Sequence, residues 1–249
     1  MKTIDLNCDM GESYGNYSVG QDDELMPYIT SCNIACGFHG GDPYHIERTI
    51  DLALVHNLRI GAHPSYPDRQ GFGRRKMIVP VDELSSLIKY QVGALKAMVE
   101  SKGGQLSYVK PHGALYNSLA HDIPEAKVVI EAIKDIDNSV QIMLLAGSPA
   151  VDLCQDLGMK VIQEGFADRR YDSAIKLMSR SIDGSVITDP YQATEQVIEM
   201  ATKNEVLCRD GSLQFVSPDS FCIHGDNPMA VEIAKEVHNA LSSRGLLAE

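Results

Sequence analysis

The chain has 249 residues, of which 44% are hydrophobic, and this is ample apolar material for a core. Its 34 Asp and Glu residues against 22 Lys and Arg residues give a net charge of −12, and no basic block occurs along the sequence. A surface of this charge repels phosphodiester backbones and anionic membranes, so we expect no nucleic-acid partner and no membrane association.

The six cysteines favour a reducing compartment over a disulfide framework. Cys8, Cys32, Cys36 and Cys222 lie inside strand-like apolar runs, where buried free thiols are common. No apolar stretch approaches the roughly 20 residues of a membrane helix, and the first residues lack the apolar run of a secretory signal. We therefore expect a cytoplasmic protein.

Seven short apolar runs alternate along the chain with segments of helical periodicity. The runs end in polar or glycine-containing turns, and they are mostly apolar on both faces, which is typical of strands buried on both sides of a parallel sheet. They lie at residues 3–8, 32–36, 58–63, 106–111, 140–146, 159–165 and 220–225.

Helix start signals separate these runs. A capping residue followed by proline stands at 42–43, 148–149 and 227–228, and Asp82 can cap a further helix. This alternation of strands and helices indicates a parallel α/β sheet, which could close into a barrel or stay open and doubly wound. We favour a TIM-barrel-like (β/α) barrel of about seven strands, because no Gly-rich nucleotide loop marks a switch point.

One region, residues 166–218, breaks the alternation. It contains a predicted helix near 191–203 and a predicted hairpin at 205–216, whose Asp-Gly pair suits a tight turn. No linker-like composition, low complexity or repeat surrounds it. We expect a single domain over 1–249 with a rim elaboration at 166–218.

Ionisable residues collect at the carboxyl ends of the predicted strands, where parallel α/β barrels build their active sites. His39, His63, His112 and His224 occupy equivalent ends, and His39 stands among glycines in GFHGGDP. A single such histidine would mean little, but four at equivalent positions favour a site. The residues at these ends are Asn7, Asp9, Glu12, His39, Asp42, His63, Lys110, His112, Glu164, Asp168, His224 and Asp226.

Each of these residues also has a purely structural interpretation. His39 alone would be a loop histidine, and helix capping is sufficient to explain Asp42. Asp226 could cap the following helix or orient the neighbouring histidine. Asp5, inside the first strand, is either structural or inward-facing near the rim. The histidines expected as ordinary surface residues are His45, His56, His121 and His238.

Arginines concentrate in two predicted rim loops. PSYPDRQGFGRRK carries Arg69, Arg74 and Arg75, and ADRRYD carries Arg169 and Arg170. These segments could be solvated surface loops, or a mobile lid whose guanidinium groups grip a carboxylate or phosphate. In an acidic protein, this concentration predicts a small anionic substrate.

A metal centre remains an open alternative. Asp9, His39, His63 and His224 are ligand types that could converge from separate strands. No compact HxxxH or HExxH spacing supports such a site, so the sequence leaves the presence of a metal undecided.

Six separated motifs, in order and over nearly the full length, carry a family resemblance. They are DLNCDMGE (5–12), CNIACGFHGGDP (32–43), GAHPSYPDRQGFGRR (61–75), VKPHGALYN (109–117), EGFADRRY (164–171) and CIHGD (222–226). Together they resemble the LamB/YcsF family, understood as the A subunit of 5-oxoprolinase. The resemblance implies a TIM-barrel-like fold of altered strand number, related to glycoside hydrolase and deacetylase barrels.

The resemblance further implies hydrolysis of 5-oxoproline to L-glutamate, with ATP as co-substrate and with 5-oxoprolinase subunits B and C as partners. In this interpretation Asp9 and His39 handle the water and its protons. His63 and His112 would serve as further proton carriers or oxyanion donors. The substrate-binding set would be Asn7, Glu12, Lys110, Arg69, Arg74, Arg75, Glu164, Arg169, His224 and Asp226.

Two alternatives to this function stay open. The chain could be a stand-alone metal-dependent amidohydrolase or deacetylase, or a non-catalytic scaffold within the complex. The sequence contains no GxxxxGK[ST], so ATP is expected on a partner or at a site of another kind.

Overall fold

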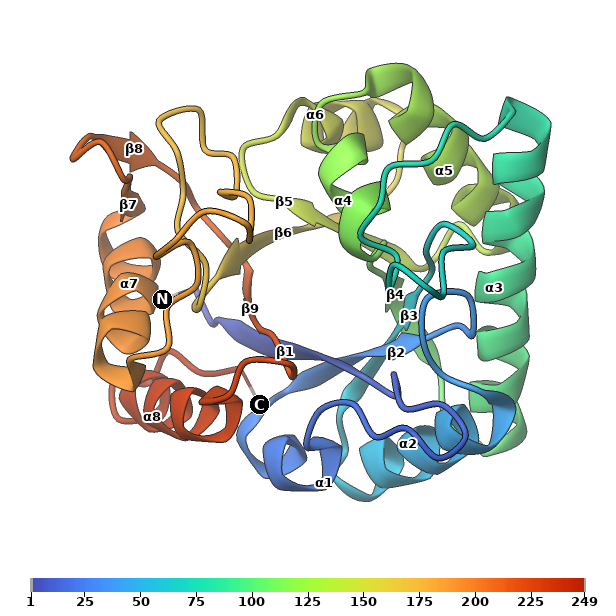
Figure 1. The fold of residues 1–249 in the computed structure, drawn as a ribbon, viewed down its shortest axis with the longest axis horizontal. Helices are drawn as coiled ribbons and strands as arrows, with labels where there is room; N and C mark the ends of the chain where they lie inside the picture. Colours follow the sequence, from blue (N-terminus) through green and yellow to red (C-terminus); the bar gives the residue numbers. More distant parts are fainter. Residues whose placement is uncertain (1, 249) are drawn as a thin grey trace.

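The computed structural model describes residues 2–248, and seven parallel strands within this range close into a barrel (Figure 1). Their hydrogen-bonded order is β1-β2-β3-β4-β5-β6-β9, and β9 completes the barrel by pairing with both β6 and β1. The strands are β1 Asp5–Met10, β2 Ser31–Ala35, β3 Arg59–His63, β4 Leu106–Val109, β5 Gln141–Leu145, β6 Val161–Phe166 and β9 Ser220–Ile223. The predicted TIM-barrel-like fold is confirmed.

Helices surround the barrel (Figure 1). Apolar side chains of the helices and strands form a buried core. The long ones are α2 Pro43–Val55, α3 Val81–Ser101, α5 Ile123–Ile136, α6 Pro149–Asp156, α7 Pro190–Lys203 and α8 Ala230–Ser242. The short ones are α1 Asp22–Leu25, the 3-10 helix η1 Met26–Tyr28 and α4 Gly113–Leu119. No helix in residues 2–248 has the length and apolar composition that a membrane span requires.

One predicted helix start is confirmed, and two helices begin at other residues than predicted. Asp42 accepts hydrogen bonds from the backbone of the first turn of α2, as predicted. The prediction for Asp82 was wrong, because Pro80 is the N-cap of α3 and Asp82 lies in its first turn. The last helix starts later than expected, since the Asn227 side chain donates to Asp168 and α8 begins at Ala230.

The inner face of the barrel is polar, so the prediction that the strands are apolar on both faces was wrong for β1. Asp5, Asn7 and Asp9 alternate with apolar residues along β1, and all three are buried. Asn7 Nδ2 donates to Glu164 Oε1 at 3.0 Å, and Asn33 Nδ2 donates to Asp9 Oδ1 at 2.8 Å. Hydrogen bonds across the strands thus compensate the burial of these polar groups.

The segment between β6 and β9 contributes both to the outer layer and to the barrel mouth. Helix α7 packs against α8, and the predicted hairpin is confirmed as β7 Glu205–Leu207 paired with β8 Leu213–Phe215. Before α7 the chain is held by two isolated bridges, Arg169 with Val186 and Tyr171 with Leu177.

Candidate active site

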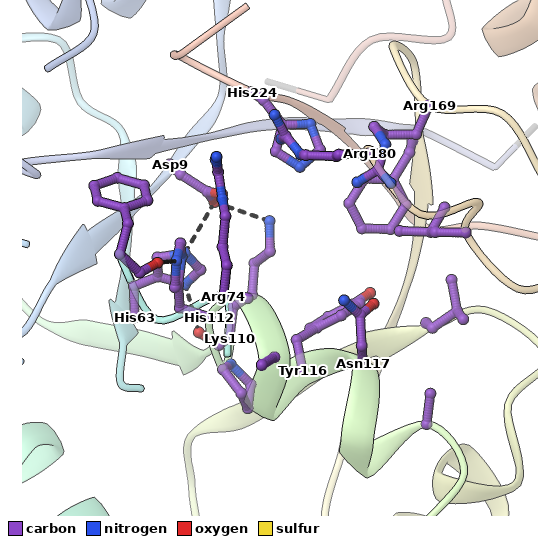
Figure 2. Close-up of a pocket in the computed structure, with 18 of the residues that line it drawn as sticks. Asp9, His63, Arg74, Lys110, His112, Tyr116, Asn117, Arg169, Arg180 and His224 are labelled. Atoms are coloured by element: carbon purple, nitrogen blue, oxygen red, sulfur yellow. Dashed lines mark hydrogen bonds and ion pairs between the residues drawn. The ribbon is translucent and has the colours of Figure 1, made fainter. Parts of the chain in front are cut away.

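A cavity of about 520 Å³ opens at the carboxyl ends of the barrel strands. In Figure 2, Asp9, His63, His112 and Lys110 form one side of it, and Arg169 and Arg180 lie on the opposite side. Its ionisable and aromatic lining consists of Asp9, Glu12, His63, Phe72, Arg74, Lys110, His112, Tyr116, His121, Phe166, Arg169, Lys176, Arg180, His224 and Asp226.

Lys110 lies buried between two carboxylates. Its Nζ is 2.9 Å from Asp9 Oδ1 and 2.8 Å from Glu164 Oε1. Burial disfavours the ammonium ion, but Asp9 and the other nearby groups outweigh this effect and hold the pKa of Lys110 well above its usual range. Burial likewise raises the pKa of Asp9, yet His63 and Lys110 together bring it well below its ordinary value. Asp9 and Lys110 are therefore a charged pair.

Next to this pair lies a compact group that we call the histidine cluster: Glu12, His39, His63 and His112. The rings of His39 and His112 stack with centroids 3.7 Å apart, and His112 Nδ1 lies 2.9 Å from His63 Nε2. Glu12 Oε1 is 3.0 Å from His39 Nε2. Burial raises the pKa of Glu12 to about 8 and lowers those of His39 and His112 well below the usual value.

A further histidine, His224, lies on another part of the cavity wall, where a carboxylate orients it. His224 Nδ1 lies 2.7 Å from Asp168 Oδ1, and the ring stacks on Phe166 with centroids 5.5 Å apart. Asn227 Nδ2 also donates to Asp168, at 3.0 Å. Burial raises the pKa of Asp168, but His224 more than offsets this and the net shift is downward. This pair fixes the ring orientation of His224, as in acid–base catalysts.

Cationic side chains surround the outer part of the cavity. Asp226 accepts from Arg74 Nη2 at 2.5 Å and from Arg180 Nη1 at 3.1 Å. Arg169 is buried, which lowers its pKa to about 10, and its Nε has no hydrogen-bond partner within residues 2–248. Lys176 lines the same cavity. The excess of cations over carboxylates at this rim suits an anionic ligand.

The family profile of LamB/YcsF matches residues 4–248 of the chain. The chain belongs to the LamB/YcsF family. A relative from Pseudomonas syringae pv. tomato, which bears the name of a 5-oxoprolinase A subunit, is 46% identical over 241 residues, covering 97% of this chain and 94% of the relative. The A subunit of 5-oxoprolinase from Pyrococcus furiosus is 45% identical over 243 residues, covering 98% of this chain and 95% of the relative.

Solved structures share the barrel fold of this chain. The crystal structure of the lactam utilization protein from Thermus thermophilus matches with a TM-score of 0.93 at 39% sequence identity, covering 99% of each chain. A family 4 carbohydrate esterase from Streptomyces lividans matches with a TM-score of 0.53 at 8% identity, covering 99% of this chain and 91% of the esterase. The esterase likeness shows a shared barrel fold only.

The structure of this LamB/YcsF protein brings most of the predicted site residues together. Asp9, His63 and His112 line the cavity, whereas His39 lies behind them, packed on His112. Of the predicted substrate-binding residues, those that line the cavity are Glu12, Lys110, Arg74, Arg169, His224 and Asp226. Asn7 and Glu164 lie deeper, where both contact Lys110.

Two predicted substrate-binding arginines do not line the cavity. Arg69 lies over the ring of Tyr14, 3.9 Å from its centroid, and donates to a backbone carbonyl. Arg75 pairs with the buried carboxylate of Asp68, and 63% of its side chain is exposed. These local partners direct both guanidinium groups away from the site.

Sequence reasoning missed several lining residues. Lys176 and Arg180 come from the segment after β6, whose path over the mouth no periodicity encodes. His121, expected as a surface residue, also lines the cavity. Tyr116 could have been predicted from the sequence, because it follows His112 by four residues, one turn along α4.

Proposed function

We propose that this chain is the A subunit of a 5-oxoprolinase and takes part in opening the lactam ring of 5-oxoproline to L-glutamate. Relatives that bear the name of the 5-oxoprolinase A subunit support this at 45% and 46% identity over nearly the whole chain. One structural observation carries the proposal: a buried, charged Asp9–Lys110 pair shares a cavity of about 520 Å³ with a cationic rim.

Hydrolysis of a lactam needs a base for the water, an acid for the leaving nitrogen and charge stabilisation at the carbonyl. We assign the base to Asp9, whose ionised state is favoured by His63 and Lys110. His63 and His112 belong to the same catalytic wall, since His63 Nε2 lies 3.4 Å from Asp9 Oδ1. His39 acts indirectly, through its contacts with Glu12 and His112.

The leaving nitrogen needs a proton, and His224 is the candidate donor. Asp168 accepts at His224 Nδ1, so Asp168 would stabilise the imidazolium form of the ring. Arg74, Arg169 and Arg180 provide positive charge for the carboxylate of 5-oxoproline or for a phosphoryl group. These assignments use separate parts of one cavity for proton transfer and for anion binding.

ATP enters the proposal as the co-substrate that activates the stable amide: its γ-phosphoryl group passes to the amide oxygen and ADP is released. Water then adds to the activated carbon, and the C–N bond breaks as the ring nitrogen takes up a proton. A second water hydrolyses the resulting acyl phosphate to L-glutamate and phosphate. The sequence has no GxxxxGK[ST] phosphate loop. We therefore assign ATP binding mainly to subunits B and C and assign to this chain the attack of water on the activated ring. The free cysteines within residues 2–248 fit the reducing cytoplasm in which we place the complex.

The test replaces Asp9 with Asn in the complex reconstituted with subunits B and C. We expect Asp9→Asn to lower the kcat for glutamate release from 5-oxoproline and ATP by about 100-fold or more, because the base is lost. Arg75→Ala is the matched control, since that side chain is exposed and pairs outside the cavity. Wild-type turnover by a folded Asp9→Asn complex would eliminate the assignment.

A stand-alone metal-dependent amidohydrolase or deacetylase is the second candidate. The observation that favours it is the grouping of Glu12 with three histidines beside the cavity. Hydrolysis of an acetylated sugar by the chain alone, without ATP and partners, would support this candidate. Glutamate release that requires ATP and both partners would reject it.

A further inference from the structure

Two ring nitrogens of the histidine cluster face each other, and their other hydrogen bonds make both of them acceptors when the rings are neutral. His63 Nδ1 lies 2.6 Å from the backbone carbonyl oxygen of Lys110. A carbonyl oxygen can only accept, so Nδ1 carries the proton. In the neutral ring, His63 Nε2 is therefore unprotonated and can only accept a hydrogen bond.

The same reasoning places the proton of His112 on its other ring nitrogen, Nε2. Its Nε2 lies 2.9 Å from the backbone carbonyl oxygen of Phe72, so Nε2 carries the proton and Nδ1 is bare. The two bare nitrogens, His63 Nε2 and His112 Nδ1, are 2.9 Å apart. Two acceptors at this distance repel each other unless a proton or a metal cation lies between them.

Carboxylate oxygens add to this concentration of lone pairs. Glu12 Oε1 lies 3.6 Å from His112 Nδ1, and Asp9 Oδ1 lies 3.4 Å from His63 Nε2. Ligand atoms from Glu12, His39, His63 and His112 all lie within 4.8 Å of one another. Lys110 is the nearest cation to Asp9, but its ammonium is already held by Asp9 and Glu164.

We propose that a divalent transition-metal ion of the zinc class binds between His63 Nε2, His112 Nδ1 and the Glu12 carboxylate. Two imidazoles and one carboxylate form a donor set that such ions prefer. Ligands of tetrahedral zinc, at roughly 2.0–2.2 Å from the ion, are about 3.3–3.5 Å apart, and the separations of 2.9 and 3.6 Å bracket that value.

The surroundings of these three residues match those of metal ligands. Each histidine donates its other ring N–H to a backbone carbonyl, which fixes the ring and the tautomer. His39 Nε2 lies 3.0 Å from Glu12 Oε1, so it would donate to the Glu12 carboxylate when that group binds an ion, and His39 is a positioning residue. Glu12, His63 and His112 line the cavity and His39 does not, so a fourth coordination position faces the cavity. A bound ion would there polarise a carbonyl or acidify water.

The test measures metal binding by the chain alone, so it does not depend on turnover, and failure of this inference is distinguishable from failure of the proposed reaction. The protein is stripped with a chelator and titrated calorimetrically with Zn²⁺, and Co²⁺ is added to a second sample to record its visible absorption. We expect one ion per chain and a Co²⁺ spectrum of nitrogen and oxygen ligands in a tetrahedral or five-coordinate site.

Variants separate ligands from the positioning residue. His63→Gln, His112→Gln and Glu12→Gln should each weaken Zn²⁺ binding by about 100-fold or more. His39→Ala should weaken it by about 10- to 100-fold, the range for loss of a partner of a ligand, and His39→Gln should restore part of this loss. His56→Ala, on the exposed end of α2, is the control and should bind as the wild type does.

Two results would overturn the proposal. One is the absence of saturable Zn²⁺ and Co²⁺ binding by the folded, stripped protein, with nitrogen NMR showing that a proton lies between His63 and His112. The other is stoichiometric binding that His63→Gln and His112→Gln leave unchanged, which would locate the ion elsewhere. Circular dichroism and thermal unfolding verify that each variant is folded.

Discussion

At the bottom of the cavity, the single ammonium group of Lys110 lies within 2.9 Å of both Asp9 and Glu164. A strand sequence such as DLNCDM predicts that its carboxylates are buried, but it does not identify the cation that compensates them. Four histidines at strand ends could be grouped from the sequence because parallel strands align their carboxyl ends. Arg69 and Arg75 could not be placed, because Tyr14 and Asp68 decide where these long side chains go.

The buried carboxyl group of Asp22 should make the stability of the fold depend on pH. Burial raises its pKa to about 6, although the backbone N–H of Gly11 donates to it at 2.8 Å. The folded state therefore holds this proton more tightly than the unfolded state, where the pKa is about 3.9. The stability that protonation provides is complete below about pH 4 and is lost as the pH rises through about 6.

Asp22→Asn should remove this dependence. We expect the free energy of unfolding of the variant, relative to the wild type, to rise between about pH 4 and pH 7, as measured by urea unfolding at several pH values. Asp23→Asn, the adjacent helix residue, is the control because no buried hydrogen bond to it is present in residues 2–248. A constant difference between Asp22→Asn and wild type over this range would contradict the pKa argument.

At the scale of elements, the loop between β3 and α3 holds the histidine cluster in place. Gly73 has φ +65°, and a Cβ added there would lie 2.7 Å from His112 Cδ2 and 2.9 Å from His39 Cβ. The backbone N–H of Gly73 donates to the carbonyl of Asp68, and its own carbonyl accepts from Ala114. The loop therefore joins the start of α4 to the wall of the cavity.

Gly73→Ala should lower activity more than the strain of a positive φ alone would, because the added Cβ would also press on His112 and His39. We expect a stability loss of about 1–3 kcal/mol in urea unfolding, together with at least a roughly 10-fold loss of glutamate release. Gly103→Ala isolates the backbone effect, because Gly103 has φ +80° and a Cβ there would meet nothing within 4 Å. Equal effects of both variants on activity would show that contact with the histidines does not matter.

Element prediction from the sequence succeeded where hydrophobic periodicity decides the outcome. All seven barrel strands and the 205–216 hairpin lie where the apolar runs and turn residues predict them. The polar inner face was missed, although Asp5, Asn7 and Asp9 alternate with apolar neighbours, because short runs are ambiguous between one-sided and two-sided burial. The helix start at Asp82 was wrong because α3 begins at Val81 without any side-chain cap, so no capping residue marks its start in the sequence.

At the scale of the whole molecule, an acidic protein gathers cations around one opening. The net charge is −12, yet Arg74, Arg169, Lys176 and Arg180 all line the cavity. Such local positive charge raises the concentration of small anions at the site. Lys176 and Arg180 arrive from the 166–218 segment, and only its folded path over the barrel brings them to the site.

We propose that these side chains act on 5-oxoproline as one site within a multi-subunit enzyme. The most direct measurement is glutamate release from 5-oxoproline and ATP, assayed with this chain alone, with subunits B and C alone, and with all three together. We predict release only when all three subunits are present, and its loss with Asp9→Asn. Equal release by subunits B and C without this chain would show that its side chains do not take part in the reaction.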